Sequence, residues 1–149
     1  MFNYTKTQRD YSPDLVVQLL ANIKETGALE GRETIYSEDN AKRFARQINE
    51  RIKAVGVSPR HKGYGYLAEA IQLLYEGDEN YKETIAARHN VTVKKVEDDM
   101  QYAIKSAWQN ASIDDLLKYY TAPVNRNTGV PTVMEFIHFF YNEIKRDIE

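Results

Sequence analysis

The sequence predicts an all-α fold, a compact multi-helix domain that contains a helix-turn-helix and carries a short N-terminal helical extension. Apolar residues recur every three or four positions in almost every segment, and no segment alternates as a half-buried strand does. Residues that cap or stop helices separate these segments. The 149 residues, 42% of them hydrophobic, suffice for one domain with a core. We expect an extension with one helix at residues 1–37 and the helical domain at residues 38–149.

Two helices are expected in the first part of the chain. Ser12 and Pro13 form a helix start, and apolar residues continue at helical spacing until Gly27 stops the helix at residue 26. Residues 28–37 are expected to form a connector. A second helix is predicted from Ser37 to Gly56, with an apolar face of Ala41, Phe44, Ile48, Ile52 and Val55. Its other face is basic, and we expect that face to be solvated: Lys42, Arg43, Arg46, Arg51 and Lys53.

Five helices are expected in the remainder. They are predicted at residues 64–75 with a stop at Gly77, at 79–89, at 92–109, directly after Ser112, and from Thr132 onward. Residues 121–131 are expected to form a loop. The aromatic residues at 119–120 and 139–141 exceed what one helix face can bury, which indicates a self-association or partner surface.

The stretch from Glu83 to Met100 has the internal pattern of a helix-turn-helix. Small residues at 86–87 permit a tight helix crossing, and Asn90 tolerates the left-handed backbone that a sharp turn requires. Thr92 is placed to cap the next helix, while Val96 and Met100 face back toward the preceding one. This spacing fits a unit whose second helix enters the major groove of DNA. An ordinary corner between two helices fits it equally well.

The second helix of this pair exposes a polar face. Lys94 and Lys95 lie at its amino end, where a reading helix meets phosphates and base edges. Gln101 is suited to adenine, and Glu97 to cytosine if it turns outward. Asp98 and Asp99 repel phosphate on the same helix.

Three motifs in one order resemble the family of C-terminal effector domains of sporulation-initiation response regulators (stage zero A proteins). They are Gly56-Val57 with Lys62-Gly63-Tyr64 and Tyr66-Leu67, then Val96-Glu97 with Ala103-Ile104 and Ala107-Trp108, then Pro131-Thr132 with Glu135-Phe136-Ile137. The likeness runs from about Ile48 to Ile148. It implies a six-helix DNA-binding domain that acts on bacterial promoters, often as a tandem dimer, with Trp108 in the core.

The recognition helix departs from the family pattern. Lys95, Asp98 and Gln101 stand where the family has recognition arginines, and Tyr102 stands at its recognition histidine, while Glu97 is retained. If the protein binds DNA, it should not read the usual element of the family. The candidate DNA-binding residues are Lys94, Lys95, Glu97, Asp98, Gln101, Tyr102, Lys105, Arg60, Lys62 and Arg126.

Several other classes are disfavoured by composition. There is no Cys, the three His residues have no ligand spacing, and adjacent Asp pairs do not converge on one helix face. We therefore expect no metal, no cofactor and no enzymatic activity. No apolar run approaches the roughly 20 residues that cross a bilayer, and the start lacks a signal-peptide core, so we expect a cytoplasmic protein without membrane contact.

The charge is unevenly distributed. Residues 59–149 hold 11 basic and 14 acidic residues, whereas residues 1–58 hold 9 and 8. The part expected to bind DNA is thus the acidic part, with a net charge of −3 (11 minus 14).

The sequence leaves two functions open. The first is a sequence-specific transcriptional regulator that binds double-stranded DNA, either as a homodimer or with a related regulator. The second is a diverged protein-interaction module, or antagonist, that acts through helix–helix contacts. Residues 1–37 are too few for a receiver domain, so phosphorylation in cis is not expected. The extension helix either packs on the effector core or pairs with another copy.

Overall fold

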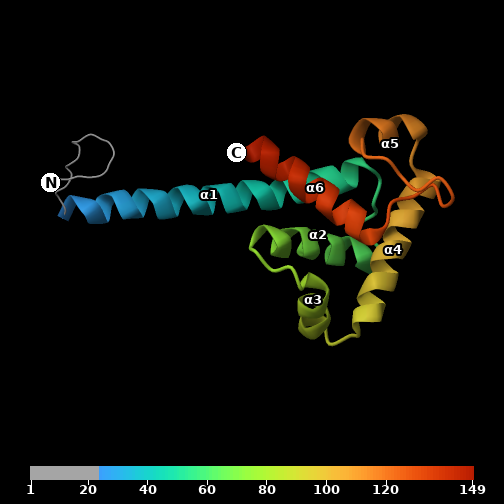
Figure 1. The fold of residues 1–149 in the computed structure, drawn as a ribbon, viewed down its shortest axis with the longest axis horizontal. Coiled ribbons are helices and arrows are strands. Elements are labelled where there is room, and N and C mark those ends of the chain that lie inside the picture. The colour runs from blue at the N-terminus through green and yellow to red at the C-terminus, as the bar shows by residue number, and fades with distance from the viewer. Residues whose placement is uncertain (1–23) are drawn as a thin grey trace. The chain divides into compact units, whose positions relative to one another are not determined.

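A computed structural model describes the backbone of residues 24–149 and the side chains of residues 39–149. The described part holds six α-helices and no strand (Figure 1), which confirms the predicted all-α class. They are α1 (Lys24–Ala54), α2 (Lys62–Tyr75), α3 (Tyr81–His89), α4 (Val93–Asn110), α5 (Ile113–Tyr119) and α6 (Val133–Ile148).

The chain divides into two compact units, Met1–Lys42 and Arg43–Glu149. In the first unit, the start and apolar face predicted for a helix at 13–26 lie almost wholly outside the described residues. The domain boundary expected between residues 37 and 38 stays a prediction.

The predicted connector at residues 28–37 and the helix start at Ser37 are wrong. The chain is helical without interruption from Lys24 to Ala54 and passes through Gly27 and Gly31. A glycine in a helix interior costs only about 1 kcal/mol relative to alanine, whereas a proline costs about 3 kcal/mol. No proline lies between Pro13 and Pro59, and five of the ten residues at 28–37 are good helix formers. Gly27 was therefore too weak a signal to end a helix.

Helix α2 occupies the centre of the second unit. It contacts α3, α4 and α6, and eight of its residues are buried. The carboxyl-terminal part of α1 joins this core, since Phe44 stacks on Tyr75 with ring centroids 4.1 Å apart. The Tyr64 hydroxyl donates a hydrogen bond of 2.7 Å to Oδ1 of Asn49 and ties α2 to α1 a second time. The predicted apolar face of α1 is correct for Phe44, Ile48, Ile52 and Val55, all of which are buried.

The tightest contact in the core is the crossing of α2 and α4. A Cβ atom placed on Gly63 would overlap the carbonyl oxygen of Asp99 and lie 2.9 Å from Cβ of Ala103. The absence of a side chain at residue 63 therefore lets the two backbones touch. Gly65 lies two residues further along the same helix. A Cβ atom placed on it would have no described atom within 4 Å.

The basic face of α1 is not simply solvated. The Arg51 guanidinium donates to Glu143 at 3.1 Å and to Asp147 at 2.7 Å, both on α6. Arg43 donates to the carbonyl oxygen of Ile148 at 3.3 Å. Lys42, Arg46 and Lys53 are exposed as expected. Two of the five basic residues thus fasten α1 to α6, a role that periodicity within one helix does not reveal.

The aromatic residues near positions 120 and 140 form an internal cluster. Tyr120 and Phe140 are buried, and Tyr120 lies 4.5 Å from Phe139 and 6.1 Å from Phe136 between ring centroids. The half-buried Trp108 packs edge-on against Tyr120 at 5.1 Å. Tyr120 and Phe140 are thus part of the core, whereas Tyr119, Phe139 and Tyr141 are half-buried, and the association surface expected of these aromatic residues stays a prediction.

Most of the predicted helix ends are confirmed. Gly56 and Gly77 follow α1 and α2 with φ of +107° and +95°, which favours glycine. Ser112 caps α5, and Thr132 forms a capping box with Glu135 at the start of α6.

The α2–α4 crossing leads to a first prediction. Gly63→Ala should lower the free energy of unfolding by about 3 kcal/mol, the upper end of overpacking costs, because the atom in the way is a backbone carbonyl. Gly65→Ala, in the same helix but facing open space, should raise it by up to about 1 kcal/mol. Urea unfolding of both variants measures this difference. Equal effects of the two substitutions would contradict a close crossing.

A second prediction concerns alkaline unfolding. Burial, and secondarily the Glu135 carboxylate, raises the pKa of Tyr120 from 10.0 to about 12. Between these pH values the unfolded chain has lost this proton while the folded protein retains it, so the free energy of unfolding falls as the pH rises. Tyr120→Phe should make that fall shallower. Because the buried hydroxyl has no hydrogen-bond partner in the described part of the chain, the variant should lose no stability at neutral pH. Unfolding followed from pH 8 to 12 measures both effects, and parallel curves for variant and parent would refute them.

Candidate nucleic-acid interface

A tight turn connects α3 to α4 as the sequence predicts. Asn90 ends α3 with φ 55° and ψ 48°, a left-handed conformation that Asn adopts more readily than most residues. The Val91 amide donates to the carbonyl oxygen of Ala86 at 3.0 Å and closes the turn. The Thr92 hydroxyl accepts from the Lys95 amide at 3.0 Å and caps α4. Ala86 is buried in the crossing, whereas Ala87 is exposed.

Helix α4 separates an apolar face from a polar one. Its buried residues are Val96, Met100, Ala103, Ile104 and Ala107. The opposite face exposes five candidate residues, namely Lys94, Lys95, Asp98, Tyr102 and Lys105. Glu97 and Gln101 are partly buried at its edges. The structure thus brings seven of the ten sequence-predicted residues together on one helix.

Both lysines at the amino end of α4 are paired with aspartates of the same helix. Nζ of Lys94 lies 3.1 Å from Oδ2 of Asp98, and Nζ of Lys95 lies 3.0 Å from Oδ1 of Asp99. Each pair spans one helical turn, the spacing at which side chains of a helix meet. Exposed pairs of this kind contribute about 0.2–1 kcal/mol, so a stronger anion can displace the aspartate. The positive charge of this segment is therefore largely neutralised in the absence of a ligand.

Glu97 does not point freely outward. Its carboxylate accepts from Nζ of Lys82 on α3 at 3.0 Å. This contact joins the two helices across the turn. Lys82 was not singled out from the sequence, and only its position one turn before Ala86 on the preceding helix could have suggested it.

A second group of cations lies beside the middle of α4. Tyr102, 62% exposed, packs edge-on against His61 with ring centroids 5.1 Å apart. His61 immediately precedes α2 and is flanked by the exposed Arg60 and Lys62. Among the described residues, neither of these two cations nor Lys105 makes an ion pair. The tertiary fold therefore places free positive charge next to Tyr102 rather than at the start of α4.

Arg126 is exposed in the loop between α5 and α6. No ion pair of the described residues joins its side chain to α4. No three His, Asp or Glu side chains in the described part of the chain are grouped as metal ligands. No helix within that part has the length and apolar character needed to traverse a bilayer.

The fold and this surface define a class of protein: an all-α domain built around a capped helix that follows a tight turn and presents a polar face. Residues 48–144, more than half of the chain, match the family described as sporulation initiation factor Spo0A C terminal. The chain belongs to this family. The resemblance seen in the three sequence motifs is thereby confirmed.

Proposed function

We propose that this protein is a cytoplasmic, sequence-specific transcriptional regulator that binds double-stranded DNA through α4. Membership of a family of sporulation effector domains, together with the exposed polar face of α4 after the turn at Asn90, supports the proposal. In this arrangement α4 enters the major groove, as the second helix of a helix-turn-helix does. Neither a catalytic role nor a cofactor is part of the proposal.

Phosphate contacts are assigned chiefly to the free cations. Arg60, Lys62 and Lys105 are exposed and have no acidic partner among the described residues, so contact with phosphate costs them no existing ion pair. Lys94 and Lys95 must exchange an aspartate for a phosphate, which reduces their net contribution. Arg126 is assigned an outlying phosphate contact. This division explains how a domain with an acidic net charge can retain local affinity for DNA.

Base contacts are assigned to the outer face of α4. Gln101 can pair with adenine. Lys95 lacks the planar fork with which arginine grips guanine. Glu97 at the edge of this face accepts a hydrogen bond from Lys82, and Tyr102 on the face packs against His61. The preferred sequence should therefore differ from the usual element of the family.

Selection of bound sequences from a random DNA library tests the proposal. The expected result is enrichment of one motif that binds at least about tenfold, or ~1.4 kcal/mol, more tightly than unselected DNA at physiological salt. Lys95→Ala should weaken binding to that motif. Lys53→Ala is the matched control, because Lys53 is exposed near the end of α1. That end lies beside the carboxyl end of α4, since the Cβ position of Gly56 is 3.0 Å from Cβ of Ala111, whereas Lys95 is at the amino end of α4. Failure to enrich any motif, or equal effects of the two lysine substitutions, would refute the proposal.

The ion pairs on α4 give a further prediction. Asp98→Asn should raise the affinity for DNA a few-fold, because it frees Lys94 and removes a charge that repels phosphate. The slope of the logarithm of the association constant against the logarithm of the salt concentration should also become steeper by about 0.9, the value for one phosphate contact. Asp114→Asn, which changes another exposed aspartate, on α5, should change neither quantity. Fluorescence anisotropy titrations at several salt concentrations measure both, and an unchanged slope in Asp98→Asn would contradict the assignment.

A second candidate function rests on the same ion pairs. If Asp98 and Asp99 keep α4 away from DNA, the domain acts as a protein-interaction module or antagonist that forms a complex with a related regulator. The self-association of the chain, and its mixing with a receiver-containing family member, can be followed by sedimentation. A mixed complex without selective DNA binding would favour this function over the first.

A further inference from the structure

One ion pair joins the two helices on either side of the turn at Asn90. Nζ of Lys82, on α3, lies 3.0 Å from Oε2 of Glu97, on α4. The pairs made by Lys94 and Lys95 stay within α4. Among the described residues, the pair of Lys82 and Glu97 is therefore the one that ties a charged side chain of α4 to another helix.

Lys82 occupies only one oxygen of the Glu97 carboxylate. Oε1 accepts no hydrogen bond from the described residues, and the side chain is 45% exposed, so this oxygen is available to another donor. Glu97 precedes Gln101 by four residues, and both are partly buried along one edge of the polar face of α4. A carboxylate in the major groove accepts from the amino group of cytosine. This edge thus presents a free acceptor oxygen beside an amide.

The ammonium group of Lys82 changes how this acceptor behaves near DNA. An unpaired carboxylate repels the phosphates that border the groove, whereas a carboxylate paired with a lysine has its charge largely offset. The pair also limits the rotation of the Glu97 side chain, which lowers the entropy lost when that side chain binds a base. Since Lys82 belongs to the neighbouring helix and is only 23% exposed, it holds the carboxylate relative to the whole turn motif.

We propose that Lys82 is a positioning residue for DNA recognition, which holds the Glu97 carboxylate so that Oε1 accepts from the amino group of one cytosine. The inference rests on the proposed function, since it requires α4 to enter the major groove. Lys82 contacts no base in this arrangement and acts through Glu97. The preference at one base pair is then decided by a side chain outside the helix that reads the DNA.

The test measures base preference, which a purely structural role of Lys82 would leave unchanged. The full chain first selects a motif from a random DNA library, and fluorescence anisotropy then gives the affinity for every single-base change of that motif. The parent should prefer cytosine about tenfold at one position. Lys82→Met, which keeps an apolar side chain but not the charge, should reduce this preference to about threefold or less and leave the other positions unchanged. Lys82→Arg, which can still donate to Oε2, should retain it.

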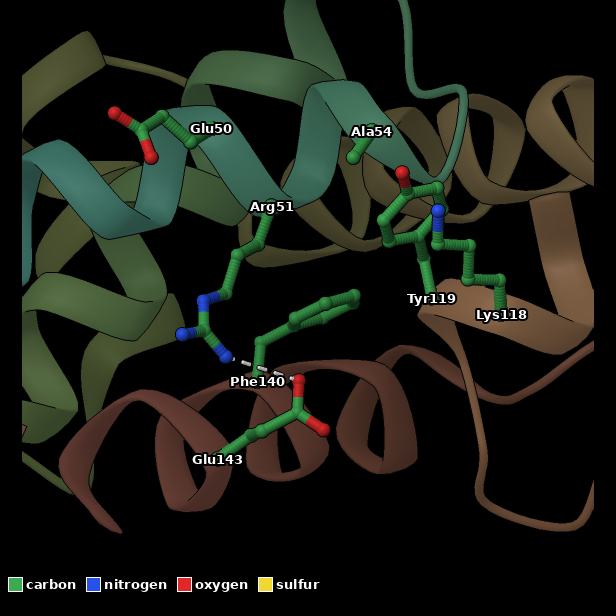
Figure 2. A pocket seen from close by; sticks show the side chains of 7 residues that line it. All are labelled: Glu50, Arg51, Ala54, Lys118, Tyr119, Phe140 and Glu143. Carbon is green, nitrogen blue, oxygen red and sulfur yellow. Dashed lines mark hydrogen bonds and ion pairs between the residues drawn. The ribbon is translucent and has the colours of Figure 1, made fainter. Parts of the chain in front are cut away.

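The glutamate identifies the base concerned. Glu97→Gln should alter the preference at the same position, and adding Lys82→Met to it should change nothing further, because Lys82 acts through the carboxylate. Glu143→Gln is the matched control, since it breaks another ion pair between two helices, that of Arg51 and Glu143 at 3.1 Å (Figure 2). It should leave every base preference unchanged. Melting temperatures verify that all variants are folded.

The possible outcomes separate this inference from the proposed function. If the parent selects a motif and Lys82→Met keeps every base preference, or strengthens that for cytosine, the role of Lys82 is overturned and DNA binding through α4 stands. Loss of the preference in Lys82→Arg, or a change at a different position in Glu97→Gln, would overturn it as well. If the parent selects no motif, the proposed function is refuted, and this inference with it.

Discussion

The contact between Gly63 and the backbone of Asp99 determines where the rest of the molecule can lie. Since a single Cβ atom at residue 63 would overlap the Asp99 carbonyl, α2 and α4 can cross only with this glycine at the point of contact. The crossing fixes the rotation of α4 about its axis, and with it the residues that α4 buries. It also brings His61, two residues before Gly63, against Tyr102, three residues after Asp99. The polar face of α4 and the basic start of α2 therefore belong to one surface as a consequence of one close approach.

Electrostatics on that surface are decided by local pairing rather than by net charge. The whole chain carries −2, a value that suggests near neutrality. On α4 the lysines at 94 and 95 are each matched by an aspartate one turn later, while Arg60, Lys62 and Lys105 have no such partner among the residues that the structure describes. An anion that approaches this face can therefore bind the cations near Tyr102 without breaking an ion pair. Lys94 and Lys95, which the sequence suggests as phosphate contacts, must first break an ion pair with an aspartate.

Arg51 organises the opposite side of the domain. Two of its three hydrogen-bonded nitrogens connect α1 to α6, and the third bonds Gln47 within α1. The aromatic cluster around Tyr120 supports this region from within, because α5 and the following loop fold back onto α6. A side chain predicted to be solvated thus becomes a fixed link between two helices.

The sequence by itself determined the helical class, the bounds of α2 to α6 within a few residues, and the turn at Asn90. These features depend on local signals, namely the spacing of apolar residues, caps such as Thr92 and Thr132, and residues that tolerate positive φ. The same signals failed at Gly27, because the cost of one glycine is small compared with the stability of a long helix free of proline. Local patterns also identified most of the candidate interface, since Lys94 to Lys105 lie on one helix. Only the tertiary structure decided which charges are free, that Lys82 holds Glu97, and that Arg51 reaches α6. Such pairings join residues far apart in the chain, and no periodicity within one helix encodes the distance between two helices.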